Sequence, residues 1–360
     1  MNKTGSGNKK KPLTQIHAGS NPRYVGAPYV FSKQSLPKTT KVYDAYWELA
    51  AERQEIFFKR FRGEIPPWTD DPILQLNKFT NSYRASDRVS QYLIARVIYP
   101  DNFTEMDLFL RIILFKLFNR IETWELLERN FGQISVDNFS IPKFSYTLTK
   151  AASLGTSIYS AAYIMPSGNI RGRHYQRKHL MHLHLLGKMI KDCLVQKLSM
   201  DGTLRGAFNL LLEYPTIGRF LAYQYAIDLN YSPLLNASEG EFIVPGPGAK
   251  EGIRKCFSDL RGLTEADIIR FVTDRQELEF EQRGISFKSL WGRRLQLIDC
   301  QNLFCEVDKY ARVKFPEYNG QQGRRRIKQR YRMNSDRLDY WYPPKWGINK
   351  KIHRGIKDDR

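Results

Sequence analysis

Apolar residues recur at three- and four-residue steps along most of the chain, and this spacing predicts helices. The pattern is clear in residues 41–61, and a long apolar stretch at 104–132 predicts a buried helix pair. Further helices are expected, in chain order, at 71–79, 86–99, 141–155, 157–168, 174–200, 264–283 and 297–315. Strand-like alternation is nearly absent. The sequence therefore predicts an all-α body of roughly ten helices between Val42 and Phe315.

The net charge of +20 is concentrated at the two ends of the chain. Residues 1–43 hold eight Lys or Arg and no acid, whereas residues 314–360 hold fourteen Lys or Arg and five acids. We therefore divide the chain into a basic flexible arm (1–41), a helical domain (42–315) and a basic aromatic tail (316–360). Cationic ends on a nearly neutral body suit a polyanion, so nucleic acid is the expected partner. The alternative is that the charge serves solubility alone.

Composition narrows the class of protein further. With 42% hydrophobic and 13% aromatic residues, the chain is globular. No apolar run reaches the roughly 20 residues that span a bilayer, and the polar N-terminus lacks the apolar core of a secretory signal. Four cysteines are too few for a disulfide framework. We expect a cytoplasmic monomer that does not bind membranes.

The stretch 211–230 contains a sharp turn between two helices, "EYPTIGRFLAYQ". It resembles a helix-hairpin-helix element, with Thr216 where the first glycine usually stands and with Gly218 as the second. Small residues let the backbone approach a phosphate, and the next helix points its free N–H groups and positive dipole end at it. Arg219 adds a cation. The turn is therefore a candidate contact to a DNA backbone; an ordinary αα-hairpin is the alternative.

A second glycine-rich turn, "VPGPGAKEGI", holds Gly246, Gly248 and Lys250. It lacks the Gly-x4-Gly-Lys-Ser/Thr order of a nucleotide triphosphate loop and the last glycine of a dinucleotide fingerprint. We therefore expect no ATP site and no cofactor in this chain. A loop that contacts a phosphate and a plain rigid turn fit this stretch equally well.

Two dense sets of polar residues stand among apolar helices and are candidates for the wall of a base pocket. The first set is either a buried ion-pair network that fixes the fold or a surface that recognises a base edge; the second is either a pocket wall or a solvated face. The first set comprises Asn81, Tyr83, Arg84, Asp87, Arg88 and Gln91. The second comprises Asp299, Gln301, Asn302, Glu306 and Lys309. In the second set, Asn302 and Glu306 are four residues apart and so lie on one side of a helix.

The histidines of residues 174–184 do not predict a metal site. They lack the His-Glu-x-x-His order and have no acidic neighbour. Basic residues surround them instead, which favours a helix that faces phosphate; these are Arg171, Arg173, Arg177 and Lys178.

Five ordered motifs carry a family resemblance: "FTNSYRASDRVSQYLI", "RIILFKLFNRIETWE", "YPTIGRFLAYQYAIDLNYS", "FIVPGPGAKEGI" and "QNLFCEVDKYAR". Over roughly residues 45–315 the chain resembles the alpha-glutamyl/putrescinyl thymine pyrophosphorylase proteins, also known as the helical domain found with 5-hydroxymethyluracil DNA kinases. That family looks like a branch of the helix-hairpin-helix DNA glycosylases. The resemblance implies a two-lobed, glycosylase-like helical body and double-stranded DNA with modified pyrimidines, whose base is flipped into a pocket. The kinase activity is not implied, because the chain lacks the Gly-x4-Gly-Lys-Ser/Thr loop that binds a nucleotide triphosphate.

The resemblance also implies a catalytic acid beyond the hairpin. Helix-hairpin-helix glycosylases carry an Asp about twenty residues past the second glycine; here Asp228, Glu239 and Glu241 are the candidates, none at the usual spacing. Glycosylases that also cut the strand carry a Lys where this chain has Phe220, which indicates a monofunctional enzyme.

The leading hypothesis is therefore excision of a modified pyrimidine, leaving an abasic site, with a role in defence against phage. The flipped base would stack on Tyr83 or Tyr223, while Asn81, Gln301 or Asn302 read its edge and a carboxylate stabilises the cationic sugar. The first alternative is a transferase that joins an amine or amino acid to pyrophosphorylated 5-hydroxymethyluracil in DNA. The second is a DNA-binding module without catalysis.

Overall fold

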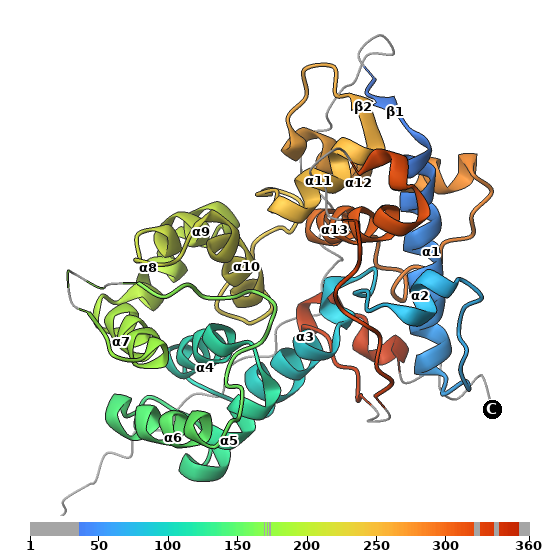
Figure 1. Cartoon of the computed structure of the whole chain (residues 1–360). Coiled ribbons are helices and arrows are strands. Elements are labelled where there is room, and N and C mark those ends of the chain that lie inside the picture. Colours follow the sequence, from blue (N-terminus) through green and yellow to red (C-terminus); the bar gives the residue numbers. More distant parts are fainter. Residues whose placement is uncertain are drawn as a thin grey trace, which may run out of the picture.

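The computed structural model describes residues 36–168, 170, 172, 174–319, 325–334 and 338–352, which form a mainly helical body (Figure 1). The all-α fold predicted from the sequence is confirmed. Among the described residues, the α-helices are α1 (Lys41–Phe61), α2 (Pro72–Leu76), α3 (Arg88–Tyr92), α4 (Glu105–Phe118), α5 (Ile121–Phe131), α6 (Ile141–Ser153), α7 (Lys178–Lys191), α8 (Leu194–Asp201), α9 (Leu204–Leu212), α10 (Arg219–Asn230), α11 (Pro247–Cys256), α12 (Glu265–Gln282) and α13 (Leu297–Lys314).

Shorter elements complete the fold. The single-turn helices are η2 (Arg84–Ser86), the π-helical turn η3 (Leu93–Ile98), η4 (Pro316–Tyr318) and η5 (Pro344–Trp346). Two short strands, β1 (Lys38–Thr39) and β2 (Phe257–Asp259), pair antiparallel. None of the helices in the described part of the chain combines the length and the apolar character that a bilayer crossing requires.

The helices form two groups that lie side by side (Figure 1). The central group consists of α4 to α10, which are contiguous in sequence and pack mainly on one another. The terminal group consists of α1, α2, α11, α12 and α13, and it joins the beginning of the described chain to its last long helices. The segment of η2 and α3 runs from the terminal group into the central one, so its residues lie where the groups meet (Figure 1).

Local sequence signals explain where several helices begin. The hydroxyl of Thr104 accepts a hydrogen bond from the Asp107 amide at the start of α4, and Thr264 and Asp267 form a capping box at the start of α12. At the start of α2, Pro72 occupies the first turn, where its missing N–H costs no hydrogen bond. These caps satisfy amides that a helix leaves without a partner.

Three helix predictions need correction. Residues 157–168 form no helix. The Ser160 amide donates to the Phe118 carbonyl at the end of α4, and Tyr163 has φ +55°. The segment therefore does not form the hydrogen bonds between its own residues that a helix requires. The helix expected at 174–200 is two helices, α7 and α8, because Cys193 takes a left-handed conformation between them. The helix expected from Ser86 begins at Arg88, with Asp87 before its first turn.

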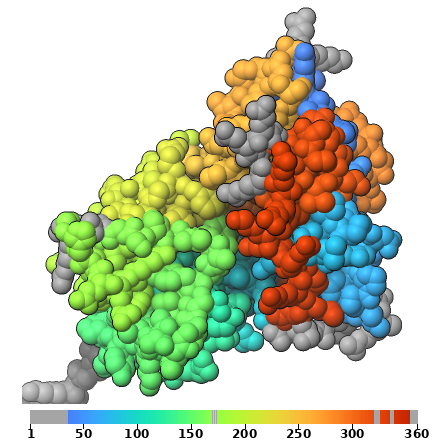
Figure 2. All heavy atoms as spheres, viewed as in Figure 1, coloured from blue at the N-terminus to red at the C-terminus, as the bar shows by residue number. Residues whose placement is uncertain are grey.

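The described part of the C-terminal segment packs on the helical body. The Tyr342 side chain is fully buried and its hydroxyl hydrogen-bonds the Ser86 hydroxyl over 2.8 Å. Lys345 donates to the Leu235 carbonyl over 2.7 Å, and the Trp346 ring lies on the Arg293 guanidinium. Figure 2 shows the red C-terminal part of the chain beside the blue N-terminal part. The division into arm, helical domain and tail stays a prediction, and residues 1–35 lie outside the described residues.

The terminal group depends on a close crossing of α11 and α13. Gly252 of α11 lies directly against the main chain of Phe304 in α13, and a Cβ atom there would be 2.7 Å from the Phe304 carbonyl carbon. Real Cβ atoms do not approach backbone atoms so closely, so this crossing requires glycine. Gly248 packs in the same way against Cys305, whose sulfur would be 3.0 Å from a Cβ atom added to this glycine.

We expect Gly252→Ala to lower the free energy of unfolding by about 1–3 kcal/mol, because the added methyl group pushes two helices apart. Gly187→Ala is the matched control: it also lies in a helix, but the added methyl group would meet only the far end of the Ile141 side chain, at 3.1 Å, and alanine regains up to about 1 kcal/mol of helix propensity. Urea denaturation followed by circular dichroism measures both. Equal stabilities of the two variants would contradict the close crossing.

Candidate functional site

The hairpin between α9 and α10 has the features of a backbone-binding turn. Thr216 has φ +70°, a conformation that glycine adopts freely, at the position where a helix-hairpin-helix element usually has its first glycine. Gly218 is exposed, a Cβ atom there would meet open space, and no side chain caps the first turn of α10. Arg219 is exposed next to it. The amides and positive dipole end of α10 are thus open to an anion.

The second glycine turn lies next to the first. A Cβ atom on Gly246 would be 2.9 Å from the Phe220 ring, so this glycine lets the two turns touch. Lys250 lies 3.7 Å from the Glu265 carboxylate. The close contacts of Gly246 and Gly248 are therefore with protein, and their predicted contact to DNA remains a prediction.

Where the two helical groups meet, three buried ionic side chains form what we call the junction cluster: Arg84, Lys116 and Asp228. The Arg84 guanidinium binds both oxygens of the Asp228 carboxylate, over 2.8 and 3.1 Å. The Lys116 ammonium lies 3.1 Å from the same carboxylate. All three side chains are at least 96% buried. One carboxylate thus faces two cations, and the cluster carries a net charge of +1.

Burial and mutual attraction act in opposite directions on the pKa values of the junction cluster. Burial acts to raise the pKa of Asp228, but Arg84 and Lys116 hold it below its ordinary value. Burial acts to lower the pKa of Arg84, yet the Asp228 charge raises it well above normal. For Lys116 burial prevails and lowers the pKa to about 8, even though Asp228 favours the charged form. Lys116 therefore holds its proton weakly for a lysine.

Aromatic rings surround the cluster. The Lys116 ammonium lies 4.7 Å from the centre of the Tyr163 ring, and the Arg84 guanidinium lies 5.5 Å from that of Tyr231. The Tyr231 hydroxyl accepts a hydrogen bond from Arg84 over 3.0 Å. Tyr163 is half-buried and stacks on Phe220 with ring centres 5.8 Å apart, so it links the cluster to the hairpin. Tyr163, which lies outside any helix, thus provides part of the cover of the junction cluster.

Arg84 is also fixed from the terminal group. Its amide donates to the Asp299 carboxylate over 2.8 Å, and that carboxylate also accepts the Gln296 amide at the start of α13. Burial raises the pKa of Asp299 to about 7. Glu239, one of the candidate catalytic acids, pairs with Arg293 over 2.7 Å and acts on Asp299 by charge repulsion.

The three candidate catalytic acids have different surroundings. Asp228 lies in the junction cluster, and Glu239 pairs with Arg293. Glu241 is exposed, and its carboxylate accepts the Leu204 amide at the first turn of α9. Of the three, Asp228 alone contacts two cations, and the structure does not bring the other two carboxylates to it by hydrogen bonds. A catalytic role for any of them stays a prediction.

The first polar set forms a network around the buried Arg53. Arg53 donates to the Asn81 side-chain oxygen over 3.1 Å, and the Asn81 amide donates to Asp87 over 2.8 Å. The Glu306 carboxylate, from the second set, accepts the neighbouring Thr80 amide over 3.0 Å. Burial raises the pKa of Asp87 to about 7. These contacts match the structural-network alternative, although none of them tests recognition of a base.

The other candidate base-pocket residues differ in burial and in their hydrogen-bond partners, and their role in a base pocket stays a prediction. Gln91 uses both ends of its amide, donating to the Ala85 carbonyl and accepting the Trp341 amide. The Tyr83 hydroxyl donates to the Arg293 carbonyl, and Tyr223 is fully buried. Gln301 is buried, while Asn302 and Arg88 are half-buried.

The predicted phosphate-facing residues at α7 are placed only in part. Arg177 is exposed just before the helix, and the Lys178 ammonium lies over the Tyr159 ring at 4.4 Å. Arg173 lies outside the described residues. Two histidines of this helix have protein partners: His182 bonds the Tyr159 hydroxyl and the Pro166 carbonyl, and His179 bonds Thr149. No group of side chains in the described ranges could hold a metal ion.

Sequence reasoning missed Lys116 and Tyr163. Lys116 is one of two cations in the apolar helix α4, the other being Arg111, and a charge in such a place is a signal that it has a buried partner. Nothing in the sequence marks Tyr163, because its contact to Lys116 depends on how the segment 154–177 folds back.

Comparisons with known proteins give a consistent family. The model of a family described as "5-hmdU DNA kinase, helical domain" matches residues 40–320. A protein of Bacillus phage SP10 named "5-hmdU DNA kinase" is 26% identical over 351 residues, covering 91% of this chain. This chain spans 54% of that relative's length. No solved structure matches, so the likeness to helix-hairpin-helix glycosylases stays a prediction.

The prediction of base excision is wrong. The family and the phage relative are named for a kinase acting on 5-hmdU DNA, which is modification of a base and not its removal. The predictions of a monofunctional glycosylase, of a hydrolase, and of a defence role that depends on abasic sites are overturned by the same finding. The transferase alternative is compatible with it.

We expect Asp228→Asn to lower the free energy of unfolding by about 3–5 kcal/mol, because it leaves two buried cations without their anion. Adding Lys116→Met removes one of these cations and is expected to restore part of the loss. Glu122→Gln is the control, since the exposed pair of Glu122 and Arg120 contributes no more than about 1 kcal/mol. Denaturation in urea measures all variants. A loss for Asp228→Asn no larger than that of the control would contradict the cluster.

Proposed function

Because this chain belongs to the family of 5-hmdU DNA kinase helical domains, we propose that it is a DNA base hypermodification transferase. Its substrate is DNA that contains 5-hydroxymethyluracil activated by pyrophosphorylation. An amine or amino acid attacks the 5-methylene carbon of the base; a C–N bond forms, the C–O bond breaks, and pyrophosphate leaves. The nucleophile is the neutral amine, so an ammonium group gives up one proton before the attack, and the positively charged nitrogen of the product gives up another afterwards.

The preceding step, pyrophosphorylation of 5-hydroxymethyluracil in DNA, is not assigned to this chain. Its 360 residues contain no Gly-x4-Gly-Lys-Ser/Thr motif, which is the usual phosphate loop of an ATP-dependent kinase. The chain matches about half of the phage relative. These two facts support a division of labour in which this chain uses the activated base and another protein unit makes it.

The junction cluster is the proposed reaction site. A pyrophosphate leaving group carries several negative charges, and preorganised cations in a water-poor site stabilise such charge most effectively. Arg84 and Lys116 supply two cations against one carboxylate. With its pKa lowered to about 8, Lys116 has a small neutral fraction at neutral pH; in that form it accepts the proton of the incoming amine and so becomes the second cation that faces the leaving pyrophosphate. These properties are the observation that carries the proposal.

Access to the cluster would require its cover to move. Tyr163 lies on a segment without helical structure, and loops of this kind commonly close over a bound substrate. A base turned out of the duplex would stack on the Tyr163 or Phe220 ring next to the hairpin. The exposed first turn of α10, with Gly218 and Arg219, would meanwhile hold the sugar–phosphate chain.

We expect Arg219→Gln to weaken binding to duplex DNA about equally for all sequences and to reduce the slope of log K against log salt by about 0.9, one phosphate contact. Arg254→Gln is the matched control, because Arg254 is equally exposed but pairs with Glu251 on α11. Fluorescence anisotropy at several salt concentrations measures both. The same slope for the two variants would exclude the hairpin as a DNA contact.

The reaction itself is tested with DNA that carries pyrophosphorylated 5-hydroxymethyluracil, incubated with candidate amines and amino acids. Nucleoside mass spectrometry is expected to show a heavier nucleoside and released pyrophosphate. Tyr163→Ala is expected to lower product formation roughly tenfold through loss of base stacking, whereas Tyr146→Ala, an exposed tyrosine on α6, leaves it unchanged. An unaltered base with tight DNA binding would show a binding module instead.

A further inference from the structure

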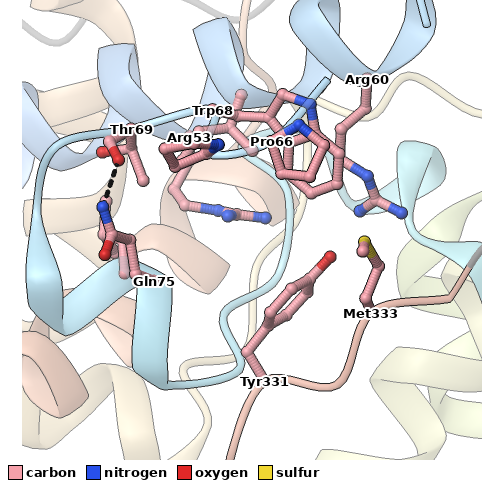
Figure 3. A pocket seen from close by; sticks show the side chains of 11 residues that line it. Arg53, Arg60, Pro66, Trp68, Thr69, Gln75, Tyr331 and Met333 are labelled. Carbon is pink, nitrogen blue, oxygen red and sulfur yellow. Dashed lines mark hydrogen bonds between the residues drawn. The ribbon is translucent and has the colours of Figure 1, made fainter. Parts of the chain in front are cut away.

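A cavity of about 320 Å³ lies in the terminal group (Figure 3), and none of the residues that line it belongs to the junction cluster. Its walls come from the second half of α1, the loop 66–69, α2 and the C-terminal segment 331–333. The size is at the lower end of small-molecule sites, roughly 300–1,000 Å³, so it would hold one small ligand and not a dinucleotide. The segment 325–334 is kept in place by main-chain hydrogen bonds that join Gln329 to Lys78 and Tyr331 to Leu76.

The polar groups of this cavity all favour an anion. Arg53 is buried and uses Nε and Nη2 on main-chain and amide oxygens, but its Nη1 atom makes no hydrogen bond within the described residues. Arg60 is half-buried, points into the cavity, and lies over the Trp68 ring. Neither arginine forms an ion pair with a described carboxylate, and no acidic residue lines the cavity. Two guanidinium groups thus face the cavity; the charges of Glu306 and Asp87 act on Arg53, but neither carboxylate belongs to the cavity lining.

A third polar group lacks a partner. The Tyr331 hydroxyl is buried and has no hydrogen-bond partner in the described part of the chain, and Figure 3 shows it pointing toward the two guanidinium groups. Buried hydroxyls are normally hydrogen-bonded, so this atom indicates a ligand that completes the site. Gln75, by contrast, is already held by the Thr69 carbonyl over 2.7 Å.

The rest of the lining is apolar and flat, from Trp68, Pro66 and Pro67 on one side to Ile56, Leu74 and Met333 elsewhere. A free amino acid fits poorly, since its ammonium would find no carboxylate. A dianionic phosphate monoester fits two guanidinium groups, and a flat ring attached to it fits the Trp68 wall. We propose that this cavity binds a nucleoside monophosphate, with the phosphate on Arg53, Arg60 and Tyr331 and the base against Trp68.

The nucleotide has two possible sources, a free mononucleotide or the 5′-phosphorylated end of a DNA strand. Isothermal titration calorimetry on the full chain uses thymidine 5′-monophosphate as the first probe and a 5′-phosphorylated thymidine trinucleotide as the second. Binding of the mononucleotide assigns the free nucleotide, whereas binding of the trinucleotide alone assigns the strand end. Thymidine and inorganic phosphate are the reference ligands. This experiment is independent of the transfer reaction, since it measures binding alone.

Arg60→Gln is expected to weaken nucleotide binding about tenfold or more, because it removes a charge-assisted contact to the phosphate. Arg62→Gln is the matched control: it removes the same charge from the end of the same helix, but Arg62 pairs with Glu55 and Glu64 outside the cavity. The control is expected to bind within about twofold of the unaltered chain. Trp68→Leu is expected to weaken the nucleotide and leave inorganic phosphate unchanged.

Three results would overturn the proposal. One is the absence of binding by either nucleotide probe. Another is an equal loss for Arg60→Gln and Arg62→Gln, which would indicate non-specific charge attraction. The third is inorganic phosphate binding as tightly as the nucleotides, which would mean that the Trp68 wall recognises no base.

Discussion

The arrangement of the two helical groups depends on Arg84. Its amide is bound by Asp299 of the terminal group, and its guanidinium is bound by Asp228 of the central group. A fully buried arginine is costly to desolvate, so the residue is stable there only while both carboxylates keep their positions. The same contacts set the distance between α10 and α13.

The ion pairs of the junction cluster contribute little to stability, but they fix the orientation of the side chains that form them. Buried ion pairs seldom stabilise a fold more than well-packed apolar side chains of similar volume would. They do fix direction, because a guanidinium donates two parallel hydrogen bonds to a carboxylate only when the two groups lie in one plane. Lys116, held by the same carboxylate, is thereby kept at a defined place with a lowered pKa of about 8. A reactive group positioned in this way is what transfer chemistry at a defined carbon requires.

Local sequence signals predicted most helices well, since caps and apolar spacing are properties of short segments. The bounds of α1 and α13 agree with the predicted ranges within one residue. The segment 157–168 was predicted wrongly because its apolar residues serve contacts to other elements, such as the burial of Met165, rather than a helical face. Where the predicted helices were wrong, contacts between residues far apart in the sequence determine the structure.

The candidate site was predicted only in pieces for the same reason. Arg84 and Asp228 were both singled out, but for different functions. Nothing in the sequence shows that these residues, 144 positions apart, form an ion pair. Lys116 and Tyr163 were missed. The hypothesis of base excision failed because it was drawn from a hairpin turn followed by an acidic residue. Such an arrangement belongs to a fold, and one fold can host several chemistries.

The chain order of the two groups has a consequence for how the protein folds. The central group is one continuous stretch, so its helices can pack while later residues are still being synthesised. The terminal group unites α1 with α11 and α13, more than 180 residues apart, and therefore has to wait for them. During that interval Trp47 of α1 lacks its neighbour Phe280, and Phe57 lacks Trp291 and Tyr340. The slowest assembly step is then the return of the last helices to the first, which places nascent chains at risk of association through α1.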